Sequence, residues 1–425
     1  MKTDKISKKN WIVILVTGLA GQLCWHVENQ WFNTFVYAKI APDPDIISNM
    51  VIYSAITSVF ATVFFGTLSD RAGKRKPSMV YGYFIWSITV ILFGLTAYLR
   101  TRSVGMAATS AVIADCVMTF FGSMAHDAGF NPWSSDISNE RNRGMLGAVI
   151  AVLPVIASIV GSLLFGNLID KFDYTVFFII IGVMMLGASI FTHFCLQDNP
   201  DIKPNRDPKG FWHQFISFFN FSQVREDRLL LWVLLIFSTY FIGFQMYFTH
   251  ITNYLIYSCG YTAGLSGILL GVGLLLASPV TFFVSRYLNQ GKFYTLMDIT
   301  VVVSIIGLLV LQVPGKVAIV GGIFLIGSGY MCLFQTLMVM LKNLYPEETR
   351  GQSEGLRTLF YVMIPMCIGT PFGSYIIKTS GVPTVNEYGI EGFAASRNLF
   401  LYAAAWTVLT LIPIHFARKE AKKRK

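Results

Sequence analysis

Long apolar stretches separated by short polar connections run through the whole chain. Stretches of about 20 residues recur, and this is the length that an α-helix needs to cross a bilayer. The pattern predicts an all-α polytopic membrane protein with twelve transmembrane helices. We expect the spans near residues 11–38, 46–69, 77–99, 106–130, 145–169, 174–195, 229–257, 262–288, 294–313, 316–342, 355–378 and 393–416.

Composition supports this interpretation. Of the 425 residues, 54% are hydrophobic and only 13% are charged, whereas about 25% charged residues is usual in soluble domains. The first span is too long, and too polar at its far end, for a cleaved signal peptide. The sequence contains no Walker-type phosphate loop, HExxH or GxSxG pattern, and its six cysteines show no metal or redox spacing. We therefore expect no enzyme activity, cofactor or metal site.

The basic residues indicate the topology. With both termini in the cytoplasm, most Lys and Arg residues fall in cytoplasmic segments, as the positive-inside rule requires. The net charge of +10 then reflects this topology and contact with anionic lipids, rather than nucleic-acid binding. We expect a multi-pass protein of the plasma membrane with both ends inside.

The chain divides into two related halves. A polar segment, 196–228, separates the first six spans (1–195) from the last six (229–425) and ends in an amphipathic stretch. Five residue pairs match at a constant offset of 207: Glu140 and Glu347, Arg143 and Arg350, Gly144 and Gly351, Phe165 and Phe372, Gly166 and Gly373. Related halves with a binding site between them are typical of secondary transporters.

A spaced motif, "GTLSDRAGKRK" (Gly66–Lys76), connects the second and third spans. Asp70 lies at the C-terminal end of a helix, where an anion is disfavoured, so it needs a cationic partner or a helix N-terminus. We assign the basic residues Arg71, Lys74, Arg75 and Lys76 to contact with anionic lipid.

This motif resembles the signature loop of the major facilitator superfamily. The resemblance implies two pseudo-symmetric six-helix bundles and an inner gate formed by Asp70, Arg71 and the second-half helix that starts near Gly355. Glu354 and Arg357, three residues apart, are expected to pair. The gate candidates are Asp70, Arg71, Arg143, Arg350, Glu354 and Arg357.

Two further loops, "HDAGFNPWSSDISNERNRG" (His126–Gly144) and "PEETRGQSEGLR" (Pro346–Arg357), resemble those of glycoside–pentoside–hexuronide:cation symporters and of sucrose–proton symporters. This resemblance implies a sugar or glycoside substrate and makes Asp127 a cation-site residue. Thr62 and Ser58 stand where the sodium-coupled members have two aspartates. We therefore expect coupling to protons rather than to sodium.

Ionisable residues inside spans are costly and often functional. Glu28 lies deep in the first span, and on an α-helix Trp25, Asn29 and Phe32 share its face. This face suits a polyhydroxylated ligand. His26 points away from it and is interpreted as a packing residue.

The remaining candidates are polar residues at similar depth. Asp115 lies near the middle of the fourth span; it is twelve residues from Asp127, about 120° away around an α-helix, so we do not expect the two to serve one site. The cation-coupling candidates are Glu28, Asp115 and Asp127, and the second half contributes Gln245, His250, Asn253 and Gln335 as substrate-binding candidates.

We expect a monomeric, proton-coupled symporter of a sugar or glycoside that works by alternating access. Because the deep charges are almost all acidic, the substrate should be neutral or cationic. A proton-coupled exporter of amphipathic cations is one alternative. A lipid or lysolipid flippase is another, although no mid-membrane cation is present to bind a phosphate.

Overall fold

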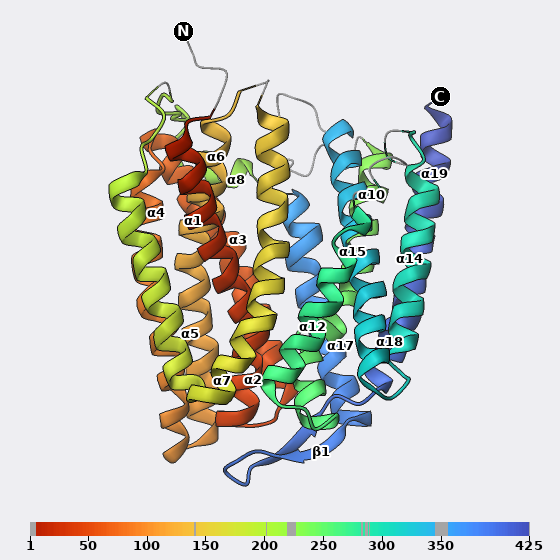
Figure 1. Ribbon diagram of the computed structural model, residues 1–425. Helices are drawn as coiled ribbons and strands as arrows, with labels where there is room; N and C mark the ends of the chain where they lie inside the picture. The colour runs from red at the N-terminus through yellow and green to blue at the C-terminus, as the bar shows by residue number, and fades with distance from the viewer. Residues whose placement is uncertain are drawn as a thin grey trace. The chain divides into compact units, whose positions relative to one another are not determined.

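The computed structural model describes residues 6–139, 142–200, 202–218, 227–281, 284, 288, 290–344 and 356–424. The chain forms two compact units, which are considered separately (Figure 1). Unit 1 comprises residues 1–41 and 53–217, and unit 2 comprises residues 42–52 and 218–425. Helix α3 (Pro44–Ala72) therefore begins in unit 2 and continues in unit 1.

Unit 1 is a bundle of long apolar helices in which α7 packs against both α1 and α4, and α5 packs against α4 (Figure 1). Besides α3, its helices are α1 (Lys8–His26), η1 (Val27–Phe32), α2 (Asn33–Phe35), η2 (Val36–Ile40), α4 (Lys76–Leu95), η3 (Thr96–Thr101), α5 (Val104–Ala125), η4 (His126–Phe130), α6 (Asn131–Asp136), α7 (Arg143–Cys195) and α8 (Phe211–Ser217).

Local sequence explains where several of these helices begin. Ser7 caps α1 by accepting a hydrogen bond from the Asn10 amide at 3.1 Å, which satisfies one of the free N–H groups at a helix start. Pro residues occupy the first turns of α4 and α6, where a missing N–H costs nothing.

Unit 2 is a second helical bundle, in which α14 packs against α15, α10 against α17, and α12 against α15. Asp227 caps α10 and Thr262 caps α12. Its elements are α10 (Arg228–Phe248), α11 (Ile251–Asn253), η5 (Tyr254–Ser258), α12 (Ala263–Ala277), α14 (Phe293–Val310), α15 (Lys316–Leu344), η7 (Leu359–Met363), α17 (Ile364–Ser380), β1 (Val382–Val385), β2 (Glu391–Ala394), α18 (Asn398–Val408) and α19 (Leu411–Lys423).

A small antiparallel hairpin, β1–β2, is the one departure from an all-helical fold within the described residues, and the hydrophobic pattern did not predict it. It lies at the end of unit 2 opposite the C-terminal helix α19 (Figure 1). The Phe393 amide donates to the Pro42 carbonyl at 2.9 Å, and Lys378 forms ion pairs with Asp43 and Asp45. The hairpin and the end of α17 therefore hold the start of α3.

The structure confirms the prediction that the chain forms many long apolar helices of membrane-spanning length. Ten helices in the described part of the chain are long and apolar enough to cross a membrane. One of them, Met145–Cys195, holds two of the predicted spans, which meet at Asp173, where φ is 64°. The shorter apolar helix Ala263–Ala277 lies within the remaining predicted span.

Candidate functional site

An acidic pair lies inside unit 1, between the first span and α5. Thr119 donates a hydrogen bond to Glu28 Oε1 at 3.0 Å, and Ser54 donates one to the Asp115 carboxyl. Asp115 is only 2% exposed. Within the described residues, Glu28 Oε2 and Asp115 Oδ1 are buried without a hydrogen-bond partner. The pair therefore offers two carboxylate oxygens to a proton or another cation.

The charges around Glu28 have one sign. Among the described residues, the groups that act on its carboxyl are Asp115, Thr119 and Asp127, and none of them is cationic. The sequence analysis does not expect Asp115 and Asp127 to serve one site, but in the structure both act electrostatically on the Glu28 carboxyl. Burying like charges in a medium of low dielectric constant is costly unless a proton or cation is bound. A bound proton or cation would therefore stabilise this cluster.

The first span does not keep the predicted α-helical face. Residues Val27–Phe32 form π-helical turns, in which i→i+5 hydrogen bonds change the angular position of each residue. Phe32 is fully buried and stacks on Phe93 with ring centroids 3.6 Å apart. The structure therefore places Phe32 in the helix packing of unit 1, apart from the acidic pair.

Trp25 and Asn29 remain close to Glu28 along the chain. Trp25 is half-buried and packs on Trp86 with centroids 4.8 Å apart. Asn29 donates from its amide to the Trp25 carbonyl at 2.8 Å. His26, as expected, serves packing, since its Nε2 lies 3.3 Å from Ser162 Oγ on α7.

A buried histidine, which the sequence analysis did not single out, lies beside Asp127. The Tyr83 hydroxyl donates its proton to the Thr17 carbonyl at 3.1 Å and therefore accepts from His126 Nδ1 at 3.2 Å. The Nε2 atom of His126 then accepts from the Gln22 amide at 2.9 Å. This network holds His126 neutral with its proton on Nδ1, and it joins the first, third and fourth spans.

In unit 2 the predicted polar residues lie along a broken span. Helix α10 ends at Phe248, a turn holds Thr249 and His250, and helix resumes with α11 and η5. Interrupted helices are a common location of binding sites in transporters. His250 is fully buried, and neither of its ring nitrogens has a hydrogen-bond partner among the described residues.

The other three candidates in unit 2 differ in their surroundings. Gln245 lies where α10 packs against Gly369 of α17, Asn253 is buried on α11, and Gln335 is half-buried on α15. The side-chain oxygens of Gln245 and Gln335 are buried without a partner in the described part of the chain.

A series of aromatic rings lies on α10 and α15, and the sequence analysis missed it. Phe248, Phe244, Tyr330 and Phe334 form a continuous series of stacked rings, called here the aromatic ladder, with neighbouring centroids 4.5, 5.0 and 6.2 Å apart. Their spacing within α10 and α15 could have revealed it, but such spacing is equally typical of a buried core.

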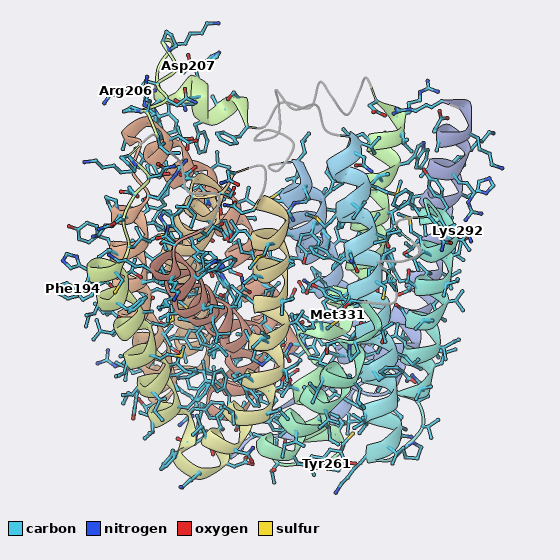
Figure 2. The ribbon with its side chains drawn as sticks, turned by 45° about the horizontal axis from the view of Figure 1, so that its top comes forward. Phe194, Arg206, Asp207, Tyr261, Lys292 and Met331 are labelled. Atoms are coloured by element: carbon cyan, nitrogen blue, oxygen red, sulfur yellow. The ribbon has the colours of Figure 1, made fainter. Side chains whose placement is uncertain are left out.

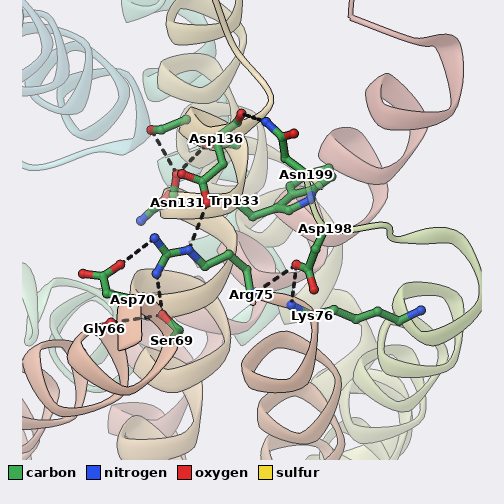
Figure 3. A network of polar contacts seen from close by, with 12 residues as sticks. Gly66, Ser69, Asp70, Arg75, Lys76, Asn131, Trp133, Asp136, Asp198 and Asn199 are labelled. Carbon is green, nitrogen blue, oxygen red and sulfur yellow. Dashed lines mark hydrogen bonds and ion pairs between the residues drawn. The ribbon is translucent and has the colours of Figure 1, made fainter. Parts of the chain in front are cut away.

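A polar network closes the end of unit 1 that carries the Gly66–Lys76 motif (Figure 3). Arg75 forms ion pairs with Asp70 at 2.6 Å and with Asp136 at 3.0 Å, and it donates to Ser69 Oγ at 2.5 Å. The expectation that Asp70 needs a cationic partner is thus confirmed. The assignment of Arg75 to lipid contact is wrong: the residue is only 9% exposed, because three oxygen groups surround its guanidinium.

The same network affects the charge of Arg75. Burial by itself lowers the pKa of this guanidinium, but the negative charges of Asp70 and Asp136 outweigh burial and raise the pKa above its usual value. Arg75 is therefore charged at every pH at which the protein works.

The segment that follows α7 also binds the motif. Asp198 accepts hydrogen bonds from the amides of Arg75 and Lys76, both at 2.9 Å, at the N-terminus of α4, where an anion is favoured. The Asn205 amide donates to the Asp70 carbonyl at 2.8 Å. Gly73 has a φ of +66°, and a Cβ there would lie 3.0 Å from the Pro204 nitrogen, so the turn requires glycine.

The remaining part of this segment lies over the same end of unit 1. Arg71 donates to the Gln214 side chain at 3.2 Å. Figure 2 shows Arg206 and Asp207 beyond the helix ends, next to α8. Asp207 accepts a hydrogen bond from His213 at 2.6 Å, and this bond lowers the pKa of the Asp207 carboxyl.

The other gate candidates are placed only in part. Arg350, Glu354 and the side chain of Arg143 lie outside the described residues, so the expected Glu354–Arg357 pair stays a prediction. The Arg357 guanidinium lies 5.8 Å from the centre of the Tyr361 ring. No group of His, Cys, Asp and Glu side chains that could hold a metal ion was found among the residues described.

Residues 11–370 match the family model of the Major Facilitator Superfamily. The chain belongs to this superfamily. It is accordingly a membrane transporter of small molecules and not an enzyme. No curated protein sequence matches the chain.

Solved structures of such transporters share its fold. The nucleoside transporter NupG has a TM-score of 0.74 and 12% identity, covering 96% of this chain and 100% of its own. A D-xylose-proton symporter has a TM-score of 0.69 and 10% identity, covering 96% and 97%. A peptide transporter, POT, has a TM-score of 0.72 and 13% identity, covering 98% and 97%. At these identities the likeness shows the fold alone.

Proposed function

We propose that this transporter couples the uptake of a sugar or glycoside to the entry of protons by alternating access. The observation that carries the proposal is the Glu28–Asp115 pair, two carboxyls that each have one buried oxygen without a partner, and no cationic neighbour, among the described residues. Asp127 is a third coupling candidate near the same carboxyl.

A proton is the cation that this pair suits best. Two neighbouring carboxyl groups in a dry site share one proton more readily than they both ionise. The hydroxyls of Thr119 and Ser54 stabilise the charge that remains. Ser58 stands where sodium-coupled relatives of the resembled family have an acid, and its hydroxyl bonds to Ser123 at 2.8 Å. These contacts favour protons over sodium.

Neutral groups adjacent to Glu28 along the chain support the proposed substrate class. Trp25 supplies an aromatic surface and Asn29 an amide next to Glu28, and this combination recognises hydroxyl-bearing molecules. The shared fold with a D-xylose-proton symporter is in keeping with this proposal.

Proteoliposomes containing the purified chain test the proposal. Labelled sugars and glycosides are offered under an inward pH gradient or an inward Na⁺ gradient. We expect accumulation driven by the pH gradient and abolished by a protonophore. Accumulation driven by Na⁺ alone would contradict proton coupling.

One alternative uses the same observation. An acidic pair that has no cationic neighbour among the described residues also attracts an organic cation, so a proton-coupled exporter of amphipathic cations is the second candidate. Vesicles with an acidic interior and a cationic dye outside distinguish the two. Dye accumulation in these vesicles together with no sugar uptake would replace the sugar proposal.

A further inference from the structure

The aromatic ladder belongs to interior helices rather than to the lipid surface. Lipid-facing helices of unit 2 carry exposed apolar side chains; α14, for example, exposes Ile299, Val302 and Ile306. In contrast, no large apolar residue is exposed along α10 within the described chain, and on α15 only Val317, at its start, is exposed. The half-buried rings on these two helices are therefore not explained by contact with lipid tails.

The ladder also carries polar groups, which lipid contact would penalise. The Tyr330 and Tyr361 hydroxyls lie 3.3 Å apart. Gln335 follows Phe334 directly, and its side-chain oxygen is buried without a partner among the described residues. An unsatisfied polar group in hydrocarbon costs several kcal/mol, so such groups face protein or a water-filled cavity.

Two further rings, Phe241 and Tyr361, pack against the ladder. Phe241 packs against Tyr330 at 5.5 Å and against Tyr361 at 4.6 Å, in both cases edge to face. Tyr361 in turn contacts Phe334 at 5.2 Å. The four ladder residues are nevertheless half-buried rather than buried. A pre-organised aromatic surface of this kind binds a flat apolar ring with little loss of conformational entropy.

We propose that the aromatic ladder is a substrate subsite for an apolar or aromatic ring, and that the transported compound is a glycoside whose aglycone occupies it. The proposal rests on the glycoside transport proposed above.

A sugar ring fits this surface less well than an aglycone. A pyranose carries a hydroxyl on most of its carbons, and each of them needs a hydrogen-bond partner when it leaves water. Among the described residues, the single hydroxyl of the ladder, on Tyr330, is already bonded to the Tyr361 hydroxyl. An aglycone ring requires few such partners.

The test compares the methyl and phenyl glycosides of the same sugars, glucose and galactose, in binding to the purified full-length chain. We expect the phenyl compound to bind about tenfold more tightly, equivalent to ~1.4 kcal/mol. Phe244→Ala and Tyr330→Ala should remove this difference, so that the phenyl glycoside binds no more tightly than the methyl glycoside. Tyr330→Phe should keep it, because stacking needs the ring and not the hydroxyl.

A matched control is Phe416→Ala, which removes a ring stacked on Trp232 elsewhere in unit 2. It should preserve the difference between phenyl and methyl compounds. Equal binding of both compounds by the wild type would overturn the subsite, as would a preference that persists in both ladder variants.

A second panel separates this proposal from the one on which it rests. Adenine and rhodamine 6G carry flat rings and no sugar. If no methyl or phenyl glycoside binds but either of these compounds binds in a ladder-dependent way, the subsite stands and the sugar assignment fails. If no compound of either panel binds in a ladder-dependent way, the subsite is refuted.

Discussion

The Glu28 side chain is central to the proposed coupling of proton and substrate. One oxygen of its carboxyl accepts a hydrogen bond from Thr119, the other has no partner in the described part of the chain, and its neighbours Asp115 and Asp127 are acids. A carboxyl in such surroundings changes its interactions strongly when it gains or loses a proton. In the proposed mechanism, substrate and proton influence each other through this residue.

Glu28→Gln should abolish gradient-driven accumulation, with a loss of at least about tenfold, because a neutral amide cannot exchange a proton. Membrane insertion and purification yield should stay normal. Uptake into proteoliposomes under a pH gradient provides the measurement, and Glu391→Gln on the exposed hairpin is the control. Wild-type accumulation in Glu28→Gln would remove this residue from the mechanism.

Arg75→Met should destabilise the protein by about 3 kcal/mol, since it leaves Asp70 and Asp136 without their buried cation. The pKa of Arg75 is raised above an already high value. Arg75 therefore contributes fully to folding stability at every pH below its usual pKa. The melting temperature of the variant in detergent should fall below that of the wild type by the same amount at pH 6 and at pH 8. Lys74→Met, at an exposed neighbouring position, should melt as the wild type does. A loss confined to one pH would contradict this account.

At the scale of elements, close helix contacts depend on single glycines. On α17, Gly373 lies against the backbone of α10: a Cβ there would be 2.2 Å from the Met246 carbonyl oxygen. Gly369, four residues earlier, contacts the same helix. Small residues at this spacing allow two membrane helices to approach closely.

Gly373→Ala should therefore lower the free energy of unfolding by about 1–3 kcal/mol, because the contacted atom belongs to the backbone and the two helices must move apart. The thermal stability of the purified chain measures this. Gly321→Ala on α15, where a Cβ meets nothing within 4 Å, is the control and should be neutral or slightly stabilising. Equal effects of the two changes would refute the close contact.

At the scale of the whole molecule, the basic residues predict that both termini lie in the cytoplasm. A green fluorescent protein fused to the C-terminus should fluoresce, since it folds in the cytoplasm. A single cysteine placed near the N-terminus should react with an impermeant maleimide only after the cells are opened. Labelling of intact cells would place that end outside.

Some features of this transporter follow from the sequence alone. Length and spacing of the apolar stretches are local properties, so they predict the membrane spans, and the Gly66–Lys76 motif indicates the superfamily. The need of Asp70 for a cation could also be inferred, because a helix C-terminus repels an anion.

Tertiary structure decided which residues meet. The π-helical turns at Val27–Phe32 placed Phe32 in the packed interior, and no periodicity count could foresee them. Arg75 became a buried ion-pair partner because Asp70 and Asp136, far apart in sequence, converge on it. The aromatic ladder likewise requires α10 and α15 to pack side by side. Contacts between distant segments depend on packing energies summed over the whole fold, whereas spans depend on local hydrophobicity alone.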